Sequence, residues 1–259
     1  MPSARLCVFN VHSWLDASGR TRIDDTLALL QPLACDLVFL NEVPQDLAIE
    51  RVAHALGMQL AYGPAQWAGN AILSRAPLSD VRNVALPAFD AEVRAVVMAR
   101  TTIAGQALTV ACTHLDHVRE RARLEQLAKL RTVVGGRACI IAGDFNALRS
   151  SDYPPVRLEA IREHRAENLV EEPRDDVVAR MDAWGFVDAA RLADSDAYLS
   201  ALARPIAPSL RSTCWAGTRI DYAWLSGSLA KRVTRAHAEV IATDVSDHRP
   251  LVVTLELTA

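Results

Sequence analysis

The sequence predicts an α/β fold in which two mixed, largely antiparallel sheets pack face to face with helices outside, a four-layered αββα sandwich. Short apolar runs that are typical of buried strands recur along the chain, and amphipathic helical stripes lie between only some of them. The stretch 58–113 contains successive strand patterns with no helix between them, which indicates antiparallel pairing.

The first 57 residues predict two strand–helix units. We expect a strand at 6–11, a helix at 23–33, a strand at 36–40 and a helix at 45–56. The second helix should end at Gly57, because glycine adopts the left-handed conformation after a last helical turn without steric cost.

Strands dominate the remainder of the chain. They are expected at 58–62, 71–74, 81–86, 93–101, 107–113, 138–142, 219–225, 233–241 and 251–257. A helix over 118–134 places Leu124, Leu127 and Leu130 on one face and ends at the glycines that follow it.

Residues 147–208 have a polar and irregular pattern, with helical pieces near 177–184 and 195–202. Their apolar content is too thin for a separate core, so we interpret them as an elaboration of a single domain spanning 1–259. A long excursion beside a site often shapes substrate access.

Composition restricts the class of protein. The net charge of -3 argues against binding to nucleic acid or membrane through bulk positive charge. The 5 cysteines show no CxxC spacing, so we expect reduced core thiols. The N-terminus lacks the pattern of a signal peptide and no long apolar run is present, which predicts a cytoplasmic monomer without stable membrane association.

Six short polar clusters interrupt or follow the apolar strands, and they carry the candidate chemistry. They contain Asn10, Glu42, His114, the pair Asp144 and Asn146, Asp221, and the pair Asp247 and His248. Carboxylate and amide oxygens are the ligands that Mg2+ prefers. A histidine that takes a proton from water needs a carboxylate to set its tautomer, which suits His248 with Asp221.

In this order, the clusters resemble the motifs of the endonuclease/exonuclease/phosphatase superfamily of metal-dependent phosphoesterases, which includes deoxyribonucleases, AP endonucleases, neutral sphingomyelinases and inositol polyphosphate 5-phosphatases. The segments that carry the resemblance are Phe9-Asn10-Val11, Leu40-Asn41-Glu42-Val43, Gly143-Asp144-Phe145-Asn146, Arg219-Ile220-Asp221-Tyr222 and Ser246-Asp247-His248-Arg249-Pro250.

The resemblance implies a role for each position. Glu42 is the implied principal ligand of Mg2+ or Mn2+, helped by Asn10 and Asp247, with Asp144 near the metal or holding the attacking water. His248, paired with Asp221, activates water or stabilises the phosphoryl oxygens. His114 and Asn146 bind the scissile phosphate, and water attacks in line without a covalent intermediate.

Some positions depart from the AP endonucleases, which weakens an abasic-site reading. His12 replaces an acidic residue of those enzymes, Asn41 replaces a glutamine, and His114 stands where they have a tyrosine. At His114 the chain resembles the deoxyribonuclease and sphingomyelinase branches.

Other polar and aromatic residues have less certain expected roles. Asn70 is expected to contact the phosphate or support the site, and for Arg94 a phosphate contact, support of Glu42 and a structural salt bridge are equally open. Trp67 and Trp215 stand just before motif segments, where a ring can stack on a base, but we favour core packing for both.

The leading interpretation is a Mg2+-dependent phosphoesterase that hydrolyses a phosphodiester, with a nucleic-acid end or a nucleotide as the first candidate substrate. The arginines expected near the motif ends are Arg75, Arg119, Arg149, Arg157 and Arg211. A lipid or small-molecule phosphoesterase is the alternative. A non-catalytic ligand-binding module on the same fold is a remote third reading, because such a chain should have lost motif residues that are intact here.

Overall fold

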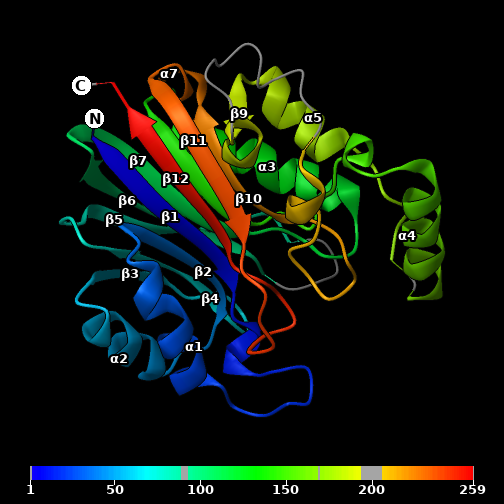
Figure 1. Cartoon of the computed structure of the whole chain (residues 1–259), viewed down its shortest axis with the longest axis horizontal. Helices are drawn as coiled ribbons and strands as arrows, with labels where there is room; N and C mark the ends of the chain where they lie inside the picture. The colour runs from blue at the N-terminus through cyan, green and yellow to red at the C-terminus, as the bar shows by residue number, and fades with distance from the viewer. Residues whose placement is uncertain (1, 89–92, 169, 194–205, 259) are drawn as a thin grey trace.

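The computed structural model describes residues 2–88, 93–168, 170–193 and 206–258. In this part of the chain the strands form two sheets of 6 strands each (Figure 1). The first sheet has the order β11 (Val233–Val240), β12 (Leu251–Leu257), β1 (Ser3–Asn10), β2 (Leu37–Val43), β4 (Gly69–Ser74) and β3 (Gln59–Gly63). The second has the order β5 (Ser79–Ala85), β6 (Ala95–Ile103), β7 (Gln106–His114), β8 (Cys139–Asp144), β10 (Asp221–Ser226) and β9 (Phe186–Asp188).

Both sheets are mixed and largely antiparallel, as the strand pattern predicts. Among the described pairs, only β1 with β2 and β7 with β8 run parallel. A helix bridges the two strands of each parallel pair, because a parallel connection has to return the chain to the same end of the sheet. These helices are α1 (Ile23–Leu30) and α3 (Glu120–Val134).

Alternating strand residues divide the core into layers. Leu6 and Val8 of β1 face the second sheet, in the same cluster as Val110 of β7. Cys7 and Phe9 point the other way, into the cluster that includes α1 and α2 (Ala48–Ala55). Successive side chains of a strand point to opposite faces, so each strand serves two apolar layers.

The outer face of the second sheet is covered by α3 and α5 (Asp176–Ala183) (Figure 1). With α1 and α2 on the first sheet, the layers follow the order αββα, which confirms the expected fold class. A short helix, α7 (Gly227–Ala230), follows β10. No helix among the described residues is long and apolar enough to cross a membrane.

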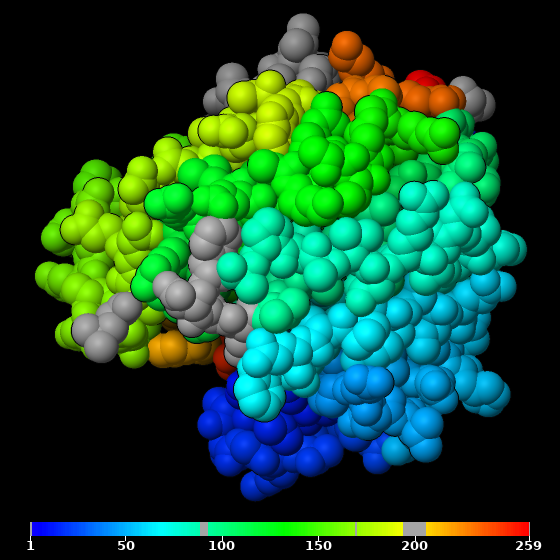
Figure 2. Space-filling model, turned by 180° about the vertical axis from the view of Figure 1, so that it is seen from behind, coloured from blue at the N-terminus to red at the C-terminus, as the bar shows by residue number. Residues whose placement is uncertain are grey.

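The elaboration differs from its expected irregular form. Residues Pro155–Glu167 form a helix, α4, which stands out from one side of the sandwich (Figures 1 and 2). Ile161 is its buried residue, so the apolar stripe that reveals most surface helices is missing. The helical piece near 177–184 corresponds to α5, the short strand β9 was not anticipated, and the piece at 195–202 lies outside the described residues.

Candidate active site

The candidate site lies where strands of both sheets end. His114 and Asp144 are paired neighbours at the ends of the parallel strands β7 and β8. Asp221 begins β10, which runs antiparallel to β8, so it also faces Asp144. Asn10 ends β1 beside Asn41 of β2, and Glu42 follows directly. Strand register therefore gathers five of the sequence clusters at one edge of the sandwich.

Asn10 connects the two sheets at this edge. Its side-chain Nδ2 lies 2.9 Å from Oε1 of Glu42 and 3.2 Å from Oδ2 of Asp144. Its Oδ1 accepts a hydrogen bond from the backbone N–H of His12 at 3.0 Å. A carboxylate from each sheet is therefore held by one amide group.

Two site residues have strained backbones. Glu42 and Asn146 adopt φ angles of 55° and 49°, in the left-handed region that residues other than glycine rarely occupy. Such conformations cost free energy and persist where the surrounding structure imposes them. Glu42 lies at the shift in the β2–β4 register between Leu40 and Val43, and Asn146 lies just after β8.

A close contact between strands explains why the GDFN segment begins with a glycine, Gly143. Its φ is 133°, and a Cβ at this position would lie 2.0 Å from the backbone oxygen of Thr113. Only glycine lets β8 approach β7 this closely. The close approach sets Asp144 opposite His114.

His248 and Asp221 form a buried acid–histidine pair. Nδ1 of His248 lies 2.9 Å from Oδ2 of Asp221, and both side chains are at most 8% exposed. Burial alone would lower the pKa of His248, but the Asp221 carboxylate outweighs it and the pKa is raised well above its usual value. Nε2 is left facing the site, 3.7 Å from Oδ2 of Asp144.

His114 has the opposite electrostatic environment. Burial, followed by the charge of Arg94, lowers its pKa well below the usual value. Arg94 Nη1, which can only donate, lies 2.9 Å from Nδ1 of His114. A second donor, the Asn146 amide that also donates to the backbone oxygen of Leu115, faces the other ring nitrogen, Nε2. That nitrogen lies 3.0 Å from Nδ2 of Asn146 and 3.5 Å from Oδ2 of Asp144.

The carboxylate of Asp144 lies close to both histidines and to Asn10. Burial and the nearby charge of Asp221 raise its pKa to about 7. Asp144, Asp221 and His248 offer ligand atoms that lie within 4.8 Å of one another, and Oδ1 of Asp221 is buried without a hydrogen-bond partner. Asp221 is already paired with His248, but Asp144 also contacts Asn10, which contacts Glu42. The carboxylates of Glu42 and Asp144 and the amide of Asn10 are oxygen donors of the kind that a hard divalent cation binds. The donor set therefore fits such an ion.

A cavity of about 610 Å³ opens over this cluster. Its walls include most of the predicted site residues, namely Glu42, Arg94, His114, Asp144, Asn146, Asp247 and His248. Asp247 lies at its edge, with Oδ1 3.3 Å from Oγ of Ser246 and 3.7 Å from Nδ1 of His12. The volume is within the range of ligand-binding pockets.

Asn70 is not among the residues that line the cavity. It is 2% exposed, accepts a hydrogen bond from Nδ2 of Asn41 at 2.7 Å, and donates to the backbone oxygen of Ala95 at 2.9 Å. Its amide is therefore committed to contacts between the strands, below the site.

The arginines near the motif ends do not line the cavity either. Arg149 pairs with Asp182, and Arg157 donates to the backbone oxygen of Ala216. Among the described residues, the arginines in the cavity wall are Arg94 and Arg165. Arg94 is one of the predicted substrate-binding candidates, whereas Arg165 was not predicted, because long side chains follow whichever carboxylate or carbonyl the fold brings within reach.

The expectation of core packing for Trp67 and Trp215 is wrong. Trp67 is 73% and Trp215 is 63% exposed, and both rings line the cavity. By contrast, Trp14 and Trp224 are buried, and Trp184 is partly buried. The spacing of apolar residues cannot separate a ring in a core from one on a loop beside a site.

The sequence interpretation assigned no function to Arg219. Arg219 is 0% exposed and donates to Asp188 and Asp152, each at 2.7 Å. Its guanidinium also lies 4.4 Å from the ring centroid of Tyr222. This buried ion cluster attaches the elaboration to the start of β10, because Arg219 lies two residues before Asp221. The signal in the sequence that could have indicated it is the arginine of the motif Arg219-Ile220-Asp221.

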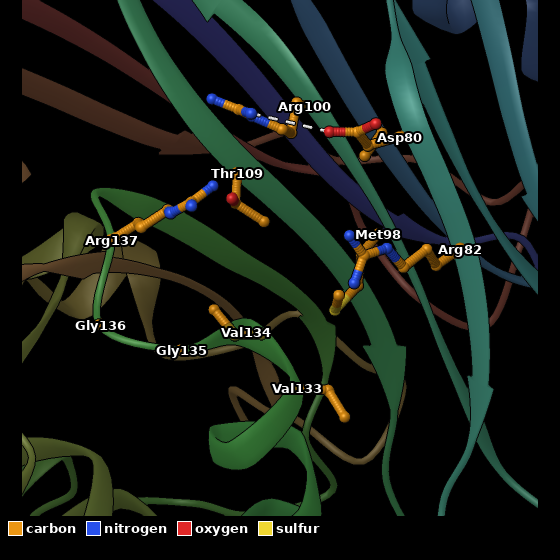
Figure 3. Close-up of a pocket in the computed structure, with 11 residues that line it drawn as sticks. Asp80, Arg82, Met98, Arg100, Thr109, Val133, Val134, Gly135, Gly136 and Arg137 are labelled. Carbon is orange, nitrogen blue, oxygen red and sulfur yellow. Dashed lines mark ion pairs between the residues drawn. The ribbon is translucent and has the colours of Figure 1, made fainter.

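A separate cavity of about 250 Å³ lies near the opposite ends of the strands (Figure 3). It contains Thr109, which pairs with the first residue of β8, whereas His114 pairs with the last. Arg82, Arg100 and Arg137 line it, and Arg100 lies 3.7 Å from Asp80. It contains no histidine, and the site cluster does not extend to it.

Comparison with known proteins places these features in a wider group. A family model described as the Endonuclease/Exonuclease/phosphatase family matches residues 7–248. The protein YbhP of Escherichia coli strain K12 is 30% identical over 184 residues, which cover 61% of this chain and 72% of YbhP.

Solved structures show the same fold. An endonuclease/exonuclease/phosphatase from Beutenbergia cavernae superposes with a TM-score of 0.71 at 20% identity, covering 100% of this chain and 72% of that one. The human Nocturnin catalytic domain with a bound sulfate anion superposes with a TM-score of 0.64 at 20% identity, covering 99% and 95%.

Proposed function

Because the chain belongs to the endonuclease/exonuclease/phosphatase family, we propose that it is a divalent-metal-dependent hydrolase of a phosphodiester, with Mg2+ or Mn2+ as the cation. Members of this family are hydrolases of phosphoester bonds and generally depend on a divalent metal. The observation that carries the proposal is the continuous contact from Glu42 through Asn10, Asp144 and His248 to Asp221.

Glu42 is the principal group that would hold the cation, with Asn10 and Asp247 beside it. Glu42 projects from a strained backbone into the cavity, and Asp247 lies at the cavity edge. When bound, the cation would neutralise negative charge on the phosphoryl group and on the leaving oxygen.

His248 and Asp221 supply the second part of the site. Asp221 holds the proton on Nδ1 of His248, so that Nε2 faces the cavity with a fixed orientation. A charged imidazole at this position donates a hydrogen bond to a phosphoryl oxygen as negative charge builds up there. Asp144, 3.7 Å away, accepts the proton of the attacking water.

His114 and Asn146 form the phosphate-binding side of the site. Nε2 of His114 and Nδ2 of Asn146 lie 3.0 Å apart on this side of the cavity. Arg94 contacts Nδ1 of His114 and brings positive charge to the cavity wall. A bound sulfate in Nocturnin is consistent with an anion site in this fold. No lysine is among the described residues that line the cavity, so a densely charged inositol phosphate is a poor candidate.

A substrate panel tests the proposal. The purified protein is assayed with Mg2+, Mn2+ or EDTA against single- and double-stranded DNA and RNA, bis-p-nitrophenyl phosphate, p-nitrophenyl phosphate and sphingomyelin. We expect metal-dependent cleavage of phosphodiesters that disappears in His248→Ala. Cleavage of sphingomyelin or of the monoester alone would replace the proposed substrate with the lipid or small-molecule alternative. Binding without turnover on any substrate would support a non-catalytic module.

A further inference from the structure

Two exposed indole rings stand beside the candidate catalytic cluster. Trp67 and Trp215 are among the six large hydrophobic side chains that are exposed in the described part of the chain, and these two alone of that set line the cavity. A large aromatic side chain left in water gives up the free energy that burial would provide. A ligand bound in the cavity against both rings would recover this free energy.

Each ring is fixed beside a different motif of the cluster, one near Glu42 and the other near His248. Trp67 lies in the loop before β4, whose Gly69 pairs with Val43 beside Glu42. Gln66 holds this loop through two hydrogen bonds with the backbone of Val93, at 3.0 and 3.4 Å. Trp67 is thus anchored beside the proposed metal ligand.

Trp215 is held beside Asp247 and His248. Its backbone N–H donates to the backbone oxygen of Asp247 at 2.7 Å, and the preceding residue, Cys214, pairs with His248 through an isolated antiparallel β-bridge of the backbone. The His164 ring of α4 contacts it at 5.0 Å between centroids, with the ring planes 80° apart. One side of the indole is supported by the elaboration, while 63% of the residue stays accessible.

We propose that Trp67 and Trp215 stack on nucleobases on the two sides of the scissile phosphate, so that the substrate is a dinucleotide or the end of a single nucleic-acid strand. This inference rests on the proposed function. A phosphodiester between nucleosides carries a flat base on each side of its phosphate, which matches one ring beside Glu42 and another beside His248 in the same cavity. A phospholipid headgroup has no flat aromatic face.

The charges around the rings support a short substrate. Two arginines line the cavity among the described residues: Arg94 follows Val93, to which Gln66 is hydrogen-bonded beside Trp67, and Arg165 follows His164, whose ring contacts Trp215. The chain as a whole has a net charge of -3. Stacking is tolerant of sequence, because every base has a π-face, whereas tight duplex binding needs many phosphate contacts. The predicted preference is for unpaired ends over duplex.

Matched substrates separate stacking from catalysis. We would compare a dinucleoside phosphodiester with analogues in which one base, then the other, is replaced by hydrogen, for the wild type and for Trp67→Ala and Trp215→Ala. Each variant should lower kcat/KM for the full dinucleotide by about 5- to 150-fold, the effect of losing one stacked base. Each should leave unchanged the rate on the analogue that lacks the base it contacts.

Control variants guard against misfolding. Trp67→Phe and Trp215→Phe should retain most of the activity, because phenylalanine also stacks. Val156→Ala removes an apolar side chain of α4 that is 80% exposed and does not line the cavity, so it should behave as the wild type. Equal losses on the full and base-free substrates, or no loss on either, would overturn the proposal.

A binding measurement keeps this inference separate from the proposed function. Without metal, the dinucleotide should quench the fluorescence of Trp67 and Trp215, and each Trp→Phe variant should lose part of that quenching. Quenching without metal-dependent cleavage by the wild type would contradict the hydrolase and uphold the stacking. Cleavage of phosphodiesters without quenching, and without loss in the alanine variants, would uphold the hydrolase and refute the stacking.

Discussion

The side-chain oxygen of Asn41 lies 2.8 Å from the backbone nitrogen of Asp144, so a strand of the first sheet directly holds the central carboxylate of the second. Nδ2 of Asn41 donates at the same time to Thr113 O, at 3.0 Å, and to Asn70. Asn41 is 0% exposed. One buried amide thus sets the distance between the two sheets at the candidate site.

Replacing Asn41 by Ala should destabilise the protein by about 2–4 kcal/mol, because it leaves at least two buried polar groups without a partner. Urea denaturation of metal-free protein measures the change. Asn83→Ala is the control, since Asn83 is exposed and also donates to a backbone oxygen, that of Pro64. Equal midpoints for the two variants would contradict the bridging role of Asn41.

Gly143→Ala should be more damaging, with a loss of about 3 kcal/mol or more, since the added Cβ meets the Thr113 oxygen and the backbone is strained. Gly136→Ala is a matched control, because a Cβ there has no atom within 4 Å. Thermal unfolding followed by circular dichroism compares the two. A small effect at Gly143 would mean that β7 and β8 can separate without cost.

Glu42→Ala should reduce metal-dependent turnover by about 100-fold or more and weaken metal binding, because the proposed principal ligand is lost. The fold should survive, since the Glu42 side chain is 28% exposed. Calorimetry with Mn2+ and initial rates provide the two readouts. Glu50→Ala on the exposed side of α2 should match the wild type, and near-normal rates for Glu42→Ala would remove it from the metal site.

Asp221→Asn should lower the pKa of His248, because the carboxylate that stabilises the imidazolium becomes neutral. It should also reduce kcat by about 10²- to 10⁴-fold with a smaller effect on KM, as the ring loses its fixed tautomer. NMR titration of the histidine ring and steady-state kinetics measure these effects. A change confined to KM would assign the pair to binding rather than to chemistry.

Metal binding should depend on pH through Asp144. The pKa of this carboxyl is raised to about 7, so it keeps its proton below that pH, and a cation has to displace the proton to bind. Apparent affinity should therefore fall as the pH drops below 7, by at most about tenfold per pH unit. Calorimetry at pH 6 in buffers of different ionisation enthalpy should detect a released proton, and Asp144→Asn should abolish it.

Much of the fold and of the candidate site could be predicted from the sequence. Near-continuous apolar runs at 6–11 and 107–113 indicated strands buried on both faces, and polar side chains at their ends indicated a shared edge. The strand register then placed His114 beside Asp144 in one sheet and Asn10 beside Asn41 in the other. Short motifs at strand ends are local patterns, and a sheet converts them into neighbours by simple geometry.

The tertiary structure decided what depends on contacts between distant segments. The sequence predicted that His248 pairs with Asp221, but not that Arg94 contacts His114. Burial lowers the pKa of both histidines; Arg94 adds to that effect at His114, whereas Asp221 outweighs it at His248. The exposure of Trp67 and Trp215 was likewise not encoded in local spacing. Charge state and solvent access are set by which groups pack around a side chain, and those groups come from loops whose course no local pattern specifies.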